Sequence, residues 1–174
     1  KDVFDKIGLF DEELVRNQDN ELNERLKRAG GRIFLIPDVK IQYFARKTFP
    51  KLWKMFFQYG YFGPLVDKKL GKPTRLRRYI PLLFVSSLML PWALMPLSHW
   101  IALIPLFSLS SYTFANFLAS FHVARKEKEI GLMLPLFCSF LDSHLSYGFG
   151  HLKGIIDFWI LGKKIKTEAV ALSR

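Results

Sequence analysis

The chain has 174 residues, of which 50% are hydrophobic, and a formal net charge of +11. A charge of this size suggests nucleic acid, but the basic residues do not follow one helix face. They gather beside apolar runs, in residues 68–78 and 125–128, as in the cytoplasmic flanks of membrane helices. Cys138 is the single cysteine, which excludes an intrachain disulfide and a Cys-x-x-Cys metal site. The composition therefore favours a membrane protein, with no nucleic-acid partner.

Two short helices are predicted first. Residues 2–7 read as the end of a helix, and the chain opens without an initiator methionine or a signal peptide, so we expect it to begin within a domain. A second helix follows Asn17, a residue type that caps helices. Asp19 lies in its first turn, where the helix dipole favours a negative charge. The glycine pair at 30–31 is expected to end this helix.

Two short strands are predicted next. Residues 32–36 form an apolar run that ends at Pro37, and residues 39–43 alternate apolar and polar side chains. Two strands and two short helices bury too little apolar surface for a stable core. We therefore expect residues 1–45 to pack on a sheet that this sequence does not contain. The predicted fold class is an α+β fragment followed by an α-helical membrane region.

An amphipathic helix is predicted to follow. Thr48 is a suitable N-cap, and Pro50 suits the first turn. Residues 52–61 place aromatic side chains on one face, which we interpret as a membrane anchor rather than a platform for a sugar. A polar, basic linker at residues 67–73 leads toward the bilayer. Residues 46–78 are thus predicted to form an interface helix and its linker.

Residues 79–174 are predicted to be the membrane region. The runs 79–95 and 100–121 lack charge, and each is close to the roughly 20 residues that span a bilayer as a helix. The turn at 96–99 is so short that the two runs should form a hairpin. Lys and Arg flank both of its ends, which places those ends in the cytoplasm. We expect a multi-pass protein of the cell inner (plasma) membrane.

A third apolar run, residues 131–150, contains Asp142 and His144 and is interrupted by two glycines. We expect a half-buried or re-entrant segment, or a crossing that returns through the residues that follow. Ionisable groups at membrane depth are candidates for binding a lipid phosphate or a sugar, whereas at the interface they would simply be hydrated. Lys153 and Asp157, four residues apart, predict a surface ion pair.

One stretch carries a resemblance to a known family. The pattern Gly-x-Phe-Asp-Glu, then Arg-Asn-Gln-Asp-Asn-Glu-Leu, then Gly-Gly in residues 8–31 resembles the acceptor-side half of a family 2 glycosyltransferase. It is most similar to the membrane-bound bacterial type that makes exopolysaccharides such as succinoglycan, or lipid-linked sugars. Residues 144–150 also resemble the C-terminal region of those enzymes. The resemblance implies a GT-A fold for residues 1–45.

The resemblance also implies site residues. In this family an acidic pair, usually Glu-Asp, opens the helix, and its Asp is the catalytic base; that Asp corresponds to Asp19, with Gln18 in place of the Glu. The alternative for Asp19 is an ordinary first-turn carboxylate. Asp11 and Glu12 are candidates for acceptor binding, with plain turn chemistry as the alternative. Arg46 is a candidate for contacting a phosphate of donor or acceptor.

No Asp-x-Asp motif, which holds the metal and the nucleotide sugar in this family, occurs in the chain. We therefore expect no cofactor-binding or metal-binding residue here. The full-length enzyme is expected to use a divalent metal, Mg²⁺ or Mn²⁺, to neutralise the leaving diphosphate. The Gln-x-x-Arg-Trp motif of processive relatives is absent after Gln58, which disfavours a processive synthase.

The function implied is inverting glycosyl transfer from a nucleotide sugar to a lipid-linked or growing glycan acceptor. It would take place at the cytoplasmic membrane face, with the donor, the acceptor and membrane lipids as partners. Two other classes remain open. One is a non-catalytic, membrane-anchored docking protein, in which the acidic helix is only a surface. The other is a basic adaptor for anionic lipids, whose binding would collapse with salt.

Overall fold

The computed structural model describes residues 2–165, and helices connected by loops make up this part of the chain. The α-helices are α1 (Asp2–Ile7), α2 (Gln18–Arg28), α3 (Phe49–Leu70), α4 (Ile80–Leu94), α5 (Leu103–Lys126) and α6 (Met133–Ile155). The short 3₁₀-helices are η1 (Leu76–Tyr79), η2 (Met95–Leu97), η3 (His99–Ala102) and η4 (Ile130–Leu132). At its end α6 continues directly into a π-helical turn, η5 (Ile156–Ile160).

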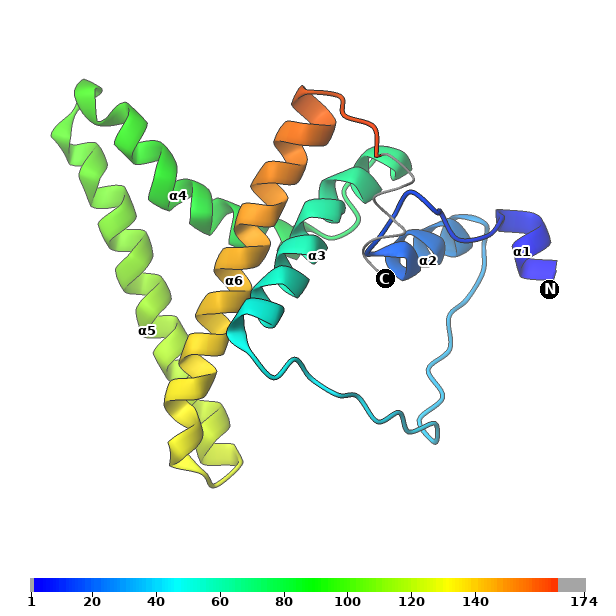
Figure 1. Ribbon diagram of the computed structural model, residues 1–174, viewed down its shortest axis with the longest axis horizontal. Coiled ribbons are helices and arrows are strands. Elements are labelled where there is room, and N and C mark those ends of the chain that lie inside the picture. The colour runs from blue at the N-terminus through cyan, green and yellow to red at the C-terminus, as the bar shows by residue number, and fades with distance from the viewer. Residues whose placement is uncertain (1, 166–174) are drawn as a thin grey trace.

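Helix α6 is the centre of the arrangement. It packs lengthwise against α3, and α4 and α5 contact it from the other side, where they diverge as the two arms of a V (Figure 1). Helices α1 and α2 lie beyond α3, on the side away from α6 (Figure 1). Helix α2 is therefore attached to α4, α5 and α6 through α3.

Glycines allow α3 and α6 to pack with their backbones close together. A Cβ added at Gly150 would overlap the carbonyl of Phe57, and one at Gly154 would overlap that of Tyr61. From the other helix, a Cβ at Gly60 would overlap the carbonyl of Tyr147. Gly150 and Gly154 form the Gly-x-x-x-Gly spacing that lets helices approach closely. The two glycines expected to interrupt the third apolar run, at 148 and 150, instead lie inside α6 at this contact and the one with α4.

The aromatic face of α3 is used in the same contact. Trp53 lies beside Phe149 with ring centroids 6.2 Å apart, and Tyr61 lies 4.8 Å from Phe158. Phe158 is 1% exposed and belongs to a small core with Leu14 and residues of α3. Burial of such a side chain stabilises by about 1.5–3 kcal/mol. Trp53 thus packs against α6, and Tyr61 against the η5 turn that continues it.

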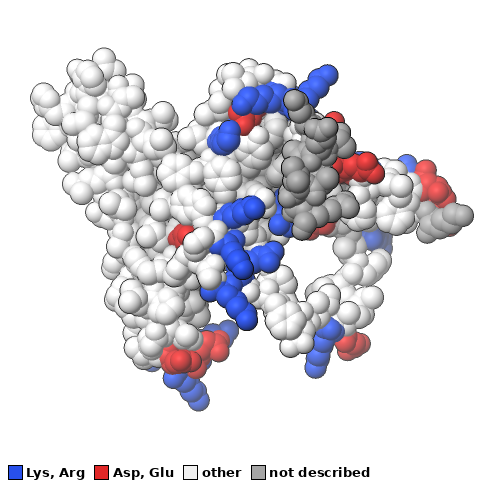
Figure 2. Space-filling view, viewed as in Figure 1, with Lys and Arg blue, Asp and Glu red and all other residues white. Residues whose placement is uncertain are grey.

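Two helical stretches are long and apolar enough to cross a membrane, Leu76–Leu97 and His99–Lys126. Only 17% and 6% of their most apolar windows are buried, so most of these side chains face outward. Figure 2 shows that the arm formed by α4 and the first part of α5 carries no charge on this face, whereas Lys and Arg gather around α3. An exposed apolar surface of this extent suits membrane association.

The prediction of an α+β fold is wrong for the residues that the structure describes, because none of them forms a strand. Residues 32–36 and 39–43 are extended but unpaired, and a turn joins them at Pro37. Their side chains are exposed, Leu35 by 92% and Ile41 by 84%. A strand is stabilised by hydrogen bonds and side-chain pairs with a neighbour, and this segment loops away from the helices (Figure 1).

Helix α3 also differs from the prediction. It starts where expected, after Thr48 and with Pro50 in its first turn, but the Thr48 side chain forms no capping hydrogen bond. It continues to Leu70, so the first half of the predicted linker at 67–73 is helical. Asp67 in that stretch is 2% exposed. The charged residues of this stretch predict a solvated linker when they are considered alone. The hydrogen-bond partners of Asp67 lie in the segment after α3, which the local pattern does not include.

Candidate functional site

The start of α2 is tied to the middle of α3. The Asn17 side-chain amide donates to the carbonyl of Tyr59 at 3.0 Å. Arg16 donates to the Gln58 side chain at 3.1 Å, and its guanidinium lies 5.7 Å from the centre of the Tyr59 ring. The helix start at Asn17 is confirmed, but Asn17 has φ 64° and makes no capping bond. Its side chain joins two helices instead of capping one.

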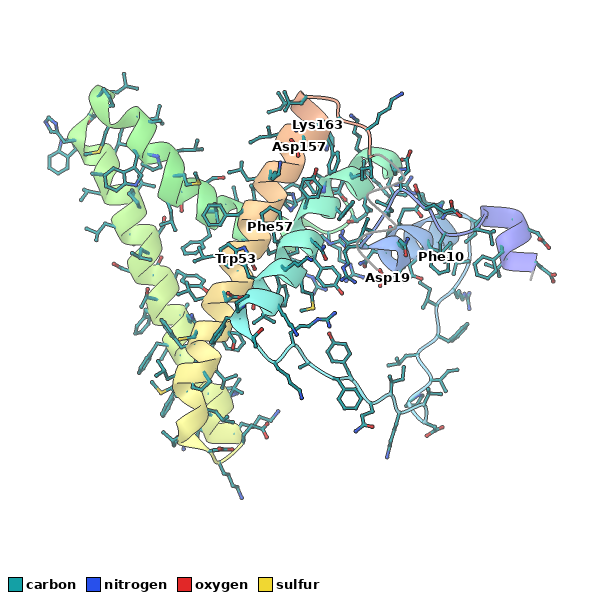
Figure 3. The ribbon with its side chains drawn as sticks, viewed as in Figure 1. Phe10, Asp19, Trp53, Phe57, Asp157 and Lys163 are labelled. Atoms are coloured by element: carbon teal, nitrogen blue, oxygen red, sulfur yellow. The ribbon has the colours of Figure 1, made fainter. Side chains whose placement is uncertain are left out.

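Asp19 is the first carboxylate of α2 and is exposed to solvent. Its Oδ1 accepts a 3.4 Å hydrogen bond from Asn20, and Figure 3 shows Asp19 at the start of α2, the end nearer α3. The neighbouring Gln18 side chain donates to the carbonyl of Asp11 at 3.4 Å, so it supports the loop and not Asp19. An exposed carboxylate at the start of a helix is open to a substrate hydroxyl, which is the position that a general base needs.

A buried ion pair holds the rest of α2. Glu21 is 4% exposed, and Arg25 donates to its two carboxylate oxygens at 2.6 and 2.8 Å. Arg25 also donates to the carbonyls of Ile7 and Leu9, which fixes the loop after α1. The hydrogen bonds that Arg25 donates to Glu21 raise the pKa of the Arg25 guanidinium. The i,i+4 spacing is typical of such a pair, whereas the loop carbonyls that complete it lie far from Arg25 in the sequence.

The residues predicted to bind the acceptor lie in different surroundings. Asp11 accepts from Lys69 of α3 at 2.6 Å and from the backbone N–H of Glu13 at 2.9 Å. Glu12 is exposed. Arg46 is exposed in the extended stretch before α3. The structure thus brings Asp11 to α3 as a structural contact, and the acceptor roles of all three residues remain predictions.

A cavity of about 610 Å³ lies where α2, α3, η1 and α6 meet. We name it the arginine pocket after the three arginines of η1 and the residue before it. Its lining consists of Asn17, Asn20, Phe56, Tyr59, Arg75, Arg77, Arg78, Pro81, Phe140, Ser143, His144 and Tyr147. No carboxylate is in this set. The pocket therefore combines three positive charges with amide donors and an apolar wall, a combination suited to an anion attached to an apolar group.

The two ionisable residues of the third apolar run behave differently. His144 lines the arginine pocket, and its Nδ1 is 2.9 Å from the Tyr112 hydroxyl of α5. Asp142 has a buried Oδ2 that finds no hydrogen-bond partner among the described residues. Of the pair, His144 is the one that the structure places at a cavity.

A larger cavity of about 920 Å³ lies between α5 and α6. Its lining is apolar except for two hydroxyl side chains, and it consists of Leu109, Ser110, Thr113, Phe114, Phe117, Ile130, Gly131, Met133, Leu134 and Phe137. We name it the apolar groove. It contains no group that would move a proton or hold a charge, so its size alone does not make it a catalytic site.

Another buried carboxylate lies at the far end of α6. Asp157 is 3% exposed and accepts from Tyr61 at 2.9 Å, Lys153 at 2.7 Å and Lys163 at 2.8 Å. Figure 3 shows Asp157 and Lys163 together at that end of the helix. The predicted pair of Lys153 and Asp157 is confirmed, but its carboxylate is buried. Hydrogen bonds from Lys153 and then Lys163 lower the pKa of Asp157 well below its usual range.

The predicted metal would need other ligands than these. Within residues 2–165 no group of three or more His, Cys, Asp and Glu side chains is placed to hold a metal ion. The residues near Asp19 are amides, and those of the arginine pocket are cationic. A cationic lining does not fit a divalent metal, so no chemical step is assigned to one here.

Comparison with known proteins gives one informative match. The chain is 29% identical over 104 residues to the succinoglycan biosynthesis protein ExoA of Rhizobium meliloti (strain 1021). The match covers 60% of this chain and 31% of that protein's length. No protein-family profile matches the chain. No solved structure matches it. The match supports a coarse, glycosyltransferase-like relation.

Proposed function

We propose that this chain is the acceptor-side and membrane-associated part of an inverting glycosyltransferase. It would transfer a sugar from a nucleotide donor to a lipid-linked or growing glycan acceptor at the cytoplasmic face of the plasma membrane, in exopolysaccharide or cell-envelope glycan synthesis. The similarity to ExoA, a succinoglycan biosynthesis protein, supports this class of reaction. The apolar helices α4 and α5 support a site at a membrane surface.

The observation that carries the proposal is the position of Asp19. It is an exposed carboxylate in the first turn of a helix that Asn17 ties to α3. Its neighbour Asn20 both donates to it and lines the arginine pocket. A general base must reach its substrate while its own helix stays fixed. Asp19 has both properties, since its side chain is open and its helix is held by Asn17 and by the buried Glu21–Arg25 pair.

In the proposed reaction, an acceptor hydroxyl attacks the anomeric carbon of the donor. The hydroxyl proton passes to the Asp19 carboxylate as the new glycosidic C–O bond forms. The bond between the anomeric carbon and the diphosphate breaks, and the nucleoside diphosphate leaves with the electron pair. Attack opposite the leaving group inverts the anomeric configuration. None of the described residues is assigned to the donor.

Substitution of Asp19 tests this role. Asp19→Asn removes the proton acceptor while it keeps the size and the exposed position of the side chain. In membranes that contain the protein at its native length, we expect sugar transfer from labelled nucleotide sugars into lipid-extractable or polymeric product to fall by about 10²–10⁴-fold, the range of general base catalysis. The amount of protein in the membrane should not change.

Glu24→Gln is the matched control. Glu24 lies on the same helix and pairs with Lys27 at 3.2 Å at the surface, so its loss removes an equal charge. Transfer should stay within about twofold of the wild type, since exposed pairs contribute little. If Asp19→Asn retains transfer, Asp19 is not the base. If no nucleotide sugar yields product even with the wild-type protein, the docking-protein hypothesis takes the place of the enzyme.

A further inference from the structure

We propose that the arginine pocket binds the phosphate or diphosphate of a long-chain lipid, and that the lipid chain follows α6 into the apolar groove. The identity of this lipid as the carrier of the acceptor rests on the proposed function. The binding site itself is argued from its charges, its walls and its continuation along α6.

The charges favour an anion. Arg75, Arg77 and Arg78 all line the pocket, and no carboxylate does. The ion pairs within residues 2–165 join other side chains and leave these three arginines out. Guanidinium groups bind phosphate oxygens through paired, charge-assisted hydrogen bonds. Three guanidinium groups around one cavity offer more hydrogen-bond donors than a single carboxylate could use, and a phosphate or diphosphate has enough oxygens to accept from them.

The segment that carries the arginines is held in place. Arg78 donates to the Thr74 hydroxyl at 2.6 Å, and Thr74 donates through its own N–H and hydroxyl to Asp67 at 3.0 and 2.9 Å. The Tyr79 hydroxyl donates to the other Asp67 oxygen at 3.0 Å. Asp67 is buried in α3. The arginines therefore extend from a fixed turn, which lowers the entropy cost of ordering them around a ligand.

The other walls are apolar. Phe56 of α3, Pro81 of α4 and Phe140 of α6 line the same cavity. A free phosphate would gain nothing from such walls, whereas the first carbons of a lipid chain would bury apolar surface against them. Arg77 and Arg78 also lie at the start of the apolar stretch Leu76–Leu97. That is the depth at which a lipid phosphate and a membrane helix meet.

The two cavities follow one face of α6. The arginine pocket is lined by α6 residues 140, 143, 144 and 147, and the apolar groove by α6 residues 133, 134 and 137 together with residues 130 and 131 of the preceding η4. This i, i+3, i+4, i+7 spacing continues without a break from one set to the next, so both sets share one side of the helix. His144 of the pocket is hydrogen-bonded to Tyr112 of α5, the helix that forms the other wall of the groove. A chain that leaves the pocket along this face of α6, past Phe140, would reach the groove.

A binding measurement that needs no sugar donor tests the site. The native-length protein in phosphatidylcholine nanodiscs is titrated with tritiated geranylgeranyl diphosphate. Competition with inorganic pyrophosphate and with geranylgeraniol separates the charged head from the apolar chain. A parallel titration in nanodiscs that also contain phosphatidylglycerol tests ordinary anionic lipid as the occupant.

The variants address each part of the site. Replacing all three pocket arginines by Gln should weaken binding by about tenfold or more, because hydrogen bonds to charged groups are lost. Arg125→Gln, at the basic end of α5 and outside the pocket, is the control and should change affinity less than about twofold. Gly131→Phe fills the apolar groove from a position where an added Cβ meets nothing within 4 Å. This substitution should weaken the binding of geranylgeranyl diphosphate and leave the weak binding of pyrophosphate unchanged.

Several results would overturn the site. If geranylgeraniol binds as tightly as geranylgeranyl diphosphate, the arginines have no role in binding. If pyrophosphate binds as tightly as geranylgeranyl diphosphate, the apolar groove has none. Full displacement by phosphatidylglycerol would make the pocket a general anionic-lipid contact. The result is independent of catalysis, because Asp19→Asn should bind the diphosphate as the wild type does. Loss of sugar transfer in Asp19→Asn with diphosphate binding intact supports both proposals. Arginine-dependent binding by a wild-type protein that transfers no sugar would leave only the lipid site.

Discussion

The side chain of Asn17 donates to the carbonyl of Tyr59 at 3.0 Å while its own backbone lies in the left-handed region, at φ 64°. Asparagine tolerates this conformation better than most residues. One residue thus both turns the chain into α2 and attaches it to α3.

Replacement of Asn17 separates these two roles. Asn17→Gly keeps the backbone freedom but loses the hydrogen bond, and should lower the free energy of unfolding by about 1 kcal/mol. Asn17→Ala adds the cost of a left-handed alanine, about 1–2 kcal/mol more. Thermal unfolding in detergent, followed by circular dichroism, measures both. Equal stability of the Gly and Ala variants would show that the backbone conformation is not under strain.

The glycines of α6 allow a second prediction. Gly150→Ala places a methyl group against the carbonyl of Phe57 and forces α3 and α6 apart. Overpacking of this kind destabilises by about 1–3 kcal/mol. Gly131→Ala is the matched control, since a Cβ there meets nothing within 4 Å and its effect should stay below about 1 kcal/mol. Similar unfolding temperatures for the two variants would contradict the close α3–α6 contact.

The buried carboxylate of Asp157 predicts a dependence of stability on acid. Because its pKa is lowered in the folded protein, mainly by the hydrogen bond from Lys153, the unfolded chain takes up a proton first as the pH falls. Its contribution is present above the unfolded pKa, about 4, and is lost as the pH falls from there toward the folded pKa. Unfolding temperatures between pH 7 and pH 3 should show this loss. Asp157→Asn should be less stable at pH 7 and should show a flatter acid profile.

Tyr61 predicts the opposite limb. Burial, together with its hydrogen bond to Asp157, raises the pKa of Tyr61 to about 12. The neutral phenol is therefore favoured by folding, and its contribution is present below the unfolded pKa of about 10 and lost as the pH rises toward 12. Ultraviolet titrations of the wild type and of Tyr61→Phe should differ by one tyrosine that ionises late. Equal amplitudes of late ionisation in the two proteins would contradict the raised pKa of Tyr61.

Local patterns in the sequence predicted several helix boundaries well. The starts of α2 after Asn17 and of α3 after Thr48, and the hairpin turn near residues 96–99, lie where residue types, prolines and apolar runs predict them, although neither Asn17 nor Thr48 makes a side-chain capping hydrogen bond. These signals depend only on residues close in the chain. The same local patterns predict strands at residues 32–36, from an apolar run, and at residues 39–43, from alternation. The described residues offer them no partner strand, and pairing is a non-local property.

The candidate site shows the same division. The sequence indicates Asp19 because both signals for it are local: its position in the first turn of a helix, and a family motif formed by residues close to it in the chain. The arginines at 75, 77 and 78 indicate only a membrane flank in the sequence, since their neighbours Asn17 and His144 come from distant parts of the chain. Asp157 was seen as half of an i,i+4 pair, and its bond to Tyr61 spans two helices. What the sequence missed was each time a contact between distant segments.

Asp67 provides the last prediction, because it holds the arginine segment without lining the pocket itself. Asp67→Ala removes the acceptor of the Thr74 N–H, the Thr74 hydroxyl and the Tyr79 hydroxyl together. The turn that carries Arg78 should loosen, and geranylgeranyl diphosphate should bind about tenfold more weakly, as when one charged hydrogen bond is lost. Asp67→Asn retains one oxygen for Thr74 and should restore most of the affinity. Limited proteolysis within residues 71–78 should increase for the Ala variant and stay low for the Asn variant. Joint recovery of ligand binding and of resistance to proteolysis in Asp67→Asn would support a positioning role for Asp67. Wild-type affinity in Asp67→Ala would mean instead that the arginines bind the ligand without this turn.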